Sequence, residues 1–180
     1  MNEIAHSVGD YLFDGLQEGE FLYAVLDGAS IPDLLDNLYS ETPPEFECLL
    51  RGELEPDMLE VAPYVVLLNR ESEFAGWLFG NGWGKHWGLF LIAPSDLSTM
   101  RSHLQTFLMV HDPDGHPMMF RFYDPRVFRV YLPTCNAEEF GTVFGPIRAY
   151  VLEDEDPKML IRFQHASGTL ETEKLPLAQT

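Results

Sequence analysis

The sequence has few basic residues, few cysteines and no long apolar run. It contains 11 lysines and arginines against 29 aspartates and glutamates, for a formal net charge of -18. Such a chain repels phosphate, so direct binding to nucleic acid or to an anionic membrane is not expected.

Cys48 and Cys135 are too few and too far apart for a disulfide framework or a zinc site. No run approaches the roughly 20 apolar residues of a spanning helix. The amino terminus also lacks the features of a secretory signal. We therefore expect a soluble, reduced, cytoplasmic protein.

The negative charge is concentrated in the first third of the chain. Residues 1–60 contain fifteen acidic residues and one base, Arg51, for a net charge of -14. Residues 61–180 contain fourteen acidic and ten basic residues, for a net charge of -4. This distribution predicts an acidic face that either binds a basic protein partner or serves solubility alone.

The motifs of common enzymes are missing as well. Residues 80–86 are rich in glycine, but Phe79 stands where a Walker loop needs glycine, and His86 stands where it needs serine or threonine. Neither Gly-x-Ser-x-Gly nor His-Glu-x-x-His occurs. The sequence therefore predicts no catalytic residue and no cofactor, and residues 80–86 are interpreted as a connection between a helix and a strand.

A histidine-rich segment at residues 111–116 offers four potential metal ligands: His111, Asp112, Asp114 and His116. The same residues fit a type I turn, with Asp112 at its first position, Pro113 at its second and Gly115 at its fourth. An EF-hand loop starting at Asp112 would need glutamate at position 123, where the chain has Tyr123. The turn is the favoured interpretation, and no metal site is predicted.

Apolar residues make up 46% of the chain, enough for a core, and their spacing alternates between strand and helix patterns. The patterns predict strands over residues 21–26, 45–50, 64–68, 87–92, 118–123, 148–152 and 159–163. They predict helices over residues 4–16, 31–38, 71–79, 96–108, 125–131 and 137–143, with Ser30 and Ser95 as caps of the second and fourth. This order predicts an α/β fold, a mixed sheet flanked by helices in a single compact domain. We expect that domain to span residues 1–166 and a polar, flexible tail to span residues 167–180.

Three tryptophans lie close together in the sequence. Trp77 and Trp87 are expected in the core, as most such residues are. Trp83 stands between glycines, and we treat it as a candidate exposed anchor because tryptophan is enriched at binding hot spots.

The most informative segment combines aromatic residues, an Asp-Pro pair and two arginines: Phe120-Arg121-Phe122-Tyr123-Asp124-Pro125-Arg126-Val127-Phe128. Its alternation is typical of a strand, and Asp124-Pro125 is a common helix start. Arg121 and Arg126 can then pair with Asp124 or with the acidic surface. This interpretation explains each residue without requiring any function.

The same segment resembles the signature of the adaptor-chaperones of bacterial type VI secretion (the Tap/TEC family). Other stretches are similar to the family in the same order: residues 62–68, 87–91, 96–108 and 144–147. The likeness covers about residues 21–150. It implies a non-catalytic cytoplasmic protein that binds a toxic effector and helps to load it onto the VgrG spike.

Five residues are candidates for partner binding: Arg121, Tyr123, Asp124 and Arg126, which lie in the segment that carries the resemblance, and Trp83, chosen for its expected exposure. Arginine offers paired hydrogen bonds to carboxylates, and tyrosine offers a rigid amphipathic contact. A structural role for Arg121, Asp124 and Arg126, holding a strand-to-helix corner, is an equal alternative.

Two other functions stay open. An acidic immunity protein that neutralises a toxin would share the size and charge of this chain. An enzyme using the histidine-rich turn is the other alternative.

Overall fold

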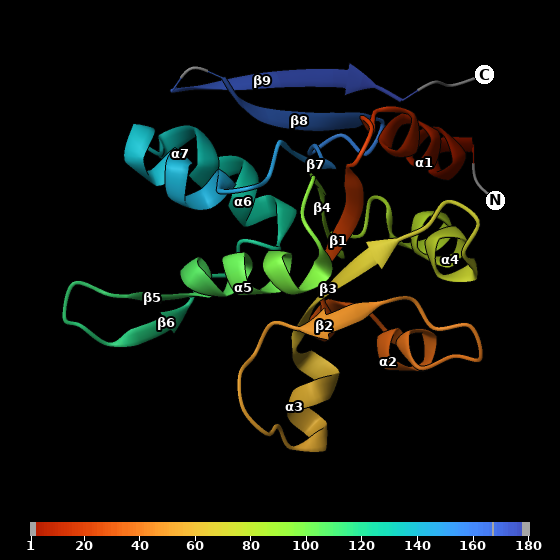
Figure 1. The fold of residues 1–180 in the computed structure, drawn as a ribbon, viewed down its shortest axis with the longest axis horizontal. Coiled ribbons are helices and arrows are strands. Elements are labelled where there is room, and N and C mark those ends of the chain that lie inside the picture. The colour runs from red at the N-terminus through yellow and green to blue at the C-terminus, as the bar shows by residue number, and fades with distance from the viewer. Residues whose placement is uncertain (1–2, 167, 178–180) are drawn as a thin grey trace.

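A seven-stranded sheet forms the middle layer of the fold in the computed structural model, which describes residues 3–166 and 168–177 (Figure 1). The strand order is β2-β3-β1-β4-β7-β8-β9. The strands are β1 (Phe21–Asp27), β2 (Phe46–Cys48), β3 (Pro63–Leu68), β4 (Gly88–Ala93), β7 (Ala149–Glu153), β8 (Met159–Ala166) and β9 (Thr169–Pro176). Two further strands, β5 (Met109–His111) and β6 (Pro117–Met119), form a separate hairpin that projects from the body (Figure 1).

Helices cover both faces of the sheet, and each face has its own core. The α-helices are α1 (Glu3–Asp14), α2 (Leu34–Leu38), α3 (Pro56–Val61), α4 (Glu73–Gly82), α5 (Leu97–Leu108), α6 (Pro125–Tyr131) and α7 (Ala137–Phe144). Short 3-10 turns occur at η1 (Gly28–Ser30) and η2 (Leu132–Thr134). In β1, Leu22 and Ala24 pack in the core with α1 and α4, whereas Tyr23 and Val25 pack in the core with α5, α6 and α7. This alternation follows from the pleat, which sends successive side chains to opposite faces.

The predicted α/β class, with one domain and a helix-flanked sheet, is confirmed. The expected mixture of strand directions is not found, because all strand pairs in the described residues are antiparallel. The reason is the position of β1. Strands β3 and β4, joined through α4, run in the same direction, but β1 lies between them and pairs with both. The helical crossover therefore connects strands that are not neighbours.

Most predicted elements are confirmed within a few residues, but the strand expected over residues 118–123 is wrong. Strand β6 ends at Met119, and the chain then turns, with the Asp124 N–H donating to the Arg121 carbonyl (3.1 Å). Phe122 and Tyr123 are both buried, although they are consecutive. Alternation fails here because a turn can send neighbouring side chains into the same core.

Two helix caps also differ from expectation. Asp33 occupies the cap position of α2, and Asp96 caps α5 by accepting the Thr99 N–H. None of the helices in the described residues has the length and apolarity to cross a membrane.

The carboxy-terminal segment differs from the expected polar tail over residues 167–180. Residues Thr169–Pro176 form β9, which pairs with β8 along its whole length. After it, Leu177 is buried in the core, and its N–H donates to the Lys158 carbonyl (2.8 Å). The polar composition reflects an edge strand with mostly exposed side chains. Residues 167 and 178–180 lie outside the described residues.

Leu177→Ala tests whether this last segment belongs to the fold. Truncating a buried leucine should lower the free energy of unfolding by about 2–5 kcal/mol. Thr172→Ala, on an exposed position of β9, should change it by less than about 0.5 kcal/mol. Urea unfolding followed by fluorescence measures both. Equal stability of wild type and Leu177→Ala would show that the segment does not contribute to folding.

Candidate functional site

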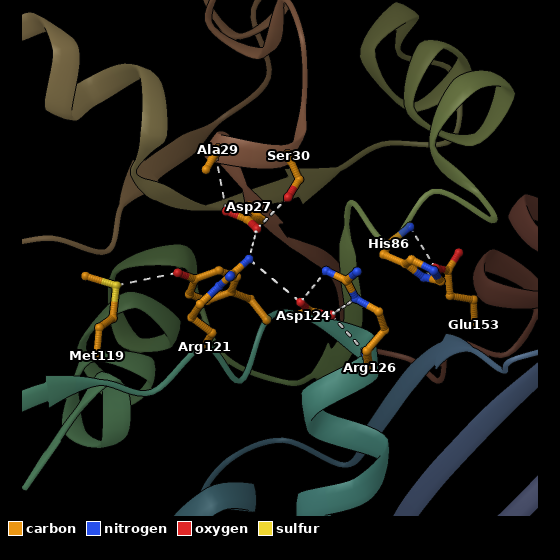
Figure 2. Close-up of polar contacts among 10 residues, drawn as sticks. Asp27, Ala29, Ser30, His86, Met119, Arg121, Asp124, Arg126 and Glu153 are labelled. Atoms are coloured by element: carbon orange, nitrogen blue, oxygen red, sulfur yellow. Dashed lines mark hydrogen bonds and ion pairs between the residues drawn. The ribbon is translucent and has the colours of Figure 1, made fainter. Parts of the chain in front are cut away.

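Three buried acidic side chains lie close together at one end of the central strands. Asp27, Asp124 and Glu153 are 2%, 3% and 3% exposed, and taken as whole residues they are the most buried charged residues in the described part of the chain. Asp27 ends β1, Glu153 ends β7, and Asp124 caps α6 above the same end of the sheet (Figure 2). Burying a charge is costly unless it is paired, so the partners of these carboxylates define the site.

Asp27 joins two segments that are far apart in the sequence. Its carboxylate accepts a hydrogen bond from the Arg121 Nη2 group (2.7 Å). It also accepts from the Ala29 N–H (3.3 Å) and the Ser30 hydroxyl (2.7 Å), and so caps the η1 turn. The hydrogen bond to Asp27 is the main cause that raises the pKa of Arg121. One carboxylate therefore holds both the turn that follows β1 and the corner that follows β6.

Asp124 and Arg126 form a bidentate pair at the start of α6. The Arg126 Nε and Nη2 groups donate to the two oxygens of Asp124 at 2.9 and 2.7 Å, and the Arg126 backbone N–H donates as well (2.9 Å). Arg121 lies farther from Asp124, at 3.7 Å. Burial alone would raise the pKa of Asp124, but the hydrogen bonds and charge of Arg126, with the charge of Arg121, lower it overall. The corner is held by ionised groups.

Glu153 anchors the glycine-rich loop between α4 and β4. Its carboxylate accepts the backbone N–H groups of Gly84 and His86. It also contacts the His86 imidazole (Figure 2). His86 has a φ of 59°, which non-glycine residues seldom adopt. The interpretation of residues 80–86 as a connection therefore holds only in part: residues 80–82 are the last residues of α4, and the loop that Glu153 fixes begins at Trp83.

Chemically, the site consists of buried carboxylates that hold nearby loops in place and of arginine N–H donors that are exposed to solvent. The hydrogen bonds of the three carboxylates are used to order nearby backbone and side chains. The arginines are only partly engaged. Arg121 and Arg126 side chains are 48% and 52% exposed, and one N–H group of Arg121 and two of Arg126 meet the carboxylates. Arginine has five such donors, so each can offer others to a carboxylate outside the chain.

The remaining candidate residues lie differently. Tyr123 is buried, which raises its pKa, and its hydroxyl contacts the Met119 sulfur (3.5 Å). Trp83 is half-buried instead of fully exposed, with its ring stacked on Phe90 and its indole N–H donating to the Pro157 carbonyl (2.7 Å). The structure thus groups Arg121, Asp124 and Arg126 but gives Trp83 intramolecular contacts of its own.

The histidine-rich turn lies at the tip of the β5–β6 hairpin. The Gly115 N–H donates to the Asp112 carbonyl (2.9 Å), as the predicted turn requires. One ligand atom each of Asp112, Asp114 and His116 lies within 4.8 Å of the others. However, the Asp112 carboxylate already accepts the backbone N–H groups of Asp114 and His116. These hydrogen bonds explain the cluster as a turn.

Sequence analysis missed Asp27, His86 and Glu153 as members of the site. Asp27 ends an apolar strand, and Glu153 begins an acidic turn, where carboxylates are usually solvated. One sequence signal could have identified Asp27 and Glu153: each directly follows a fully apolar run. Such a run predicts a buried strand, so a charged residue at its end lies close to the core.

Comparison with known protein families finds one match. A family described as "Domain of unknown function (DUF4123)" matches residues 22–141, which include the corner at residues 120–128. The match extends over two thirds of the chain. Comparisons with the curated proteins and with the solved structures found no match.

Asp124→Asn tests the charged corner, because asparagine can still cap a helix but carries no negative charge. We expect the free energy of unfolding at pH 7 to fall by about 1–3 kcal/mol, since the arginines lose a charged partner. The pKa of Asp124 is lower in the folded chain than its unfolded value of about 3.9. Its stabilising contribution is therefore present above that value and is lost as the pH falls through the folded pKa. The difference between wild type and variant should shrink on acidification.

Asp96→Asn is the matched control for that experiment. Asp96 also caps a helix, but it is exposed and its partner is the Thr99 N–H. Urea unfolding at several pH values should show a smaller change for this variant. Equal losses from the two substitutions would contradict a special role for the Asp124–Arg126 pair.

Proposed function

The chain belongs to the DUF4123 domain family, and from this premise we propose that it is a non-catalytic adaptor for type VI secretion. In this proposal it binds a cognate toxic effector in the bacterial cytoplasm and promotes loading of the effector onto the VgrG spike. The family is associated with adaptors of such effectors. The observation that carries the proposal is the family match across residues 22–141.

The chemistry of the site agrees with binding more than with catalysis. A general acid or base must be free to exchange a proton with a substrate. Asp27, Asp124 and Glu153 instead accept hydrogen bonds from neighbouring backbone and side chains, and all three are buried. The groups that face outward are guanidinium donors, which recognise carboxylates by geometry. We therefore propose Arg121 and Arg126 as points of contact with the effector.

Capture of the natural partners tests the proposed function. The chain, used as bait in lysate of its own host, should recover a toxin-like effector or a VgrG spike, identified by mass spectrometry. Recovery of neither from cells that express the secretion system would contradict an adaptor role.

Co-expression then separates an adaptor from an immunity protein. An adaptor should raise the abundance of the effector and support its secretion. Rescue of cells from the active toxin, without an effect on secretion, would instead identify an immunity protein.

Arg126→Lys tests the guanidinium contact with the effector so recovered. Lysine keeps the positive charge beside Asp124 but cannot make paired hydrogen bonds. We expect effector binding, measured by biolayer interferometry, to weaken roughly tenfold, as for one moderate interface residue. Arg70→Lys is the control, because Arg70 is 42% exposed and also pairs with acidic side chains. Unchanged binding by Arg126→Lys would exclude this contact.

A further inference from the structure

A hollow of about 560 Å³ lies between the η1–α2 segment and the end of α3. We propose that this hollow, called the α2–α3 groove, holds a segment of the effector that combines apolar and basic side chains. The proposal rests on the proposed function and specifies the chemistry of the effector segment. The groove is lined by residues 28–36, Glu60 and Val61. Its volume is within the range of about 300–1,000 Å³ that is typical of ligand pockets.

The α2–α3 groove combines apolar and acidic side chains. Ile31 and Leu34 are buried beneath it, and Val61 is 46% exposed at its side. Asp33, Asp36 and Glu60 also line it, and all three are exposed. A segment that fills this groove must therefore offer both apolar surface and positive charge.

The acidic charges of the groove are not neutralised within the described part of the chain. The ion pairs there involve other acidic residues, and no lysine or arginine is among the groove residues. The first 60 residues, which include nearly all of the groove, carry a net charge of -14. Complementary charge across an interface steers association and selects partners. Lysine or arginine on the occupant is the charge that this surface favours.

The wall of the groove is fixed in place before any partner binds. The Gly28 N–H donates to the Ala62 carbonyl (3.1 Å), which joins η1 to the residue after α3. A Cβ atom at Gly28 would lie 2.4 Å from that oxygen, so only glycine allows this approach. Asp27 holds Ala29 and Ser30 from the other side. A preformed wall lowers the entropic cost of binding.

The same wall connects the groove to the candidate site. Asp27, which orders the η1 turn, is itself held by Arg121 (2.7 Å). Figure 2 shows Ala29 and Ser30 on one side of Asp27 and Arg121 on the other. Arg121 is thus a positioning residue for the groove in addition to any contact of its own.

A pair of designed peptides tests the charge preference directly. One is a fluorescein-labelled amphipathic helix with leucine on one face and lysine on the other, and its match has glutamate in place of lysine. Fluorescence anisotropy should show binding of the lysine peptide, weaker at higher salt, and no binding of the glutamate peptide. Failure of the lysine peptide to bind the wild-type chain would overturn the proposal.

Two variants with the same change in net charge locate the binding. Asp36→Lys with Glu60→Lys reverses charge in the groove, and Glu171→Lys with Glu173→Lys reverses exposed charges on β9. The groove variant should bind the lysine peptide roughly tenfold more weakly, and the β9 variant within about twofold of wild type. Equal weakening would show that net charge alone attracts the peptide, and it would overturn the groove. If the reversed groove variant unfolds, Asp36→Asn with Glu60→Gln replaces it, and Glu171→Gln with Glu173→Gln becomes its charge-matched control.

The same variants, used as bait with the natural effector, separate this inference from the proposed function. Loss of the effector from the groove variant but not from the β9 variant supports the groove. Full recovery by both variants overturns the groove and leaves the adaptor function standing. Failure of the wild-type chain to recover any effector contradicts the adaptor function and, with it, the occupant proposed for the groove.

Discussion

The pairing of Asp27 with Arg121 is the interaction on which the arrangement of the site depends. It joins the end of β1 to a corner 94 residues later in the chain. A buried carboxylate without a partner would cost several kcal/mol, so the corner and the strand end stabilise each other's position. At the first turn of α6, Asp124 is likewise a buried carboxylate paired with an arginine, Arg126. Together the two pairs place opposite charges next to each other and leave the outer edges of both arginines in solvent.

The sheet supplies the frame for these pairs. Because β1 lies between β3 and β4, its last residue is next to the first residues of both neighbours. The antiparallel pairing of β4 with β7 brings Glu153 to the same end of the sheet. Helices cover both faces of the sheet, and the carboxylates at this end are buried. The loops held by these carboxylates carry the polar surface of the site, while the strands remain apolar.

Structural and binding roles need not exclude each other at the corner. Arg121 orders Asp27, and through it the η1 turn, while most of its N–H groups remain available. A partner that contacts the arginines would therefore meet a surface whose shape is already set. The acidic α2–α3 groove lies beyond the same turn. The exposed arginines and the acidic groove that we propose as a docking site are thus neighbours, an arrangement that would suit a partner with mixed charge.

The sequence by itself determined the local elements and the class of the fold. Apolar runs marked the strands around residues 21–26 and 64–68, Asp124-Pro125 marked the start of α6, and Asp112-Pro113 marked a turn, because each signal acts within a few residues. Only the tertiary structure decided the strand order, the burial of Asp27 beside Arg121 and the pairing of β9. Those depend on contacts between distant segments, whose energies no local pattern encodes. An exposed edge strand and a polar tail can have the same composition, so residue types alone do not distinguish them. In the same way, the sequence does not distinguish a solvated aspartate from a buried one.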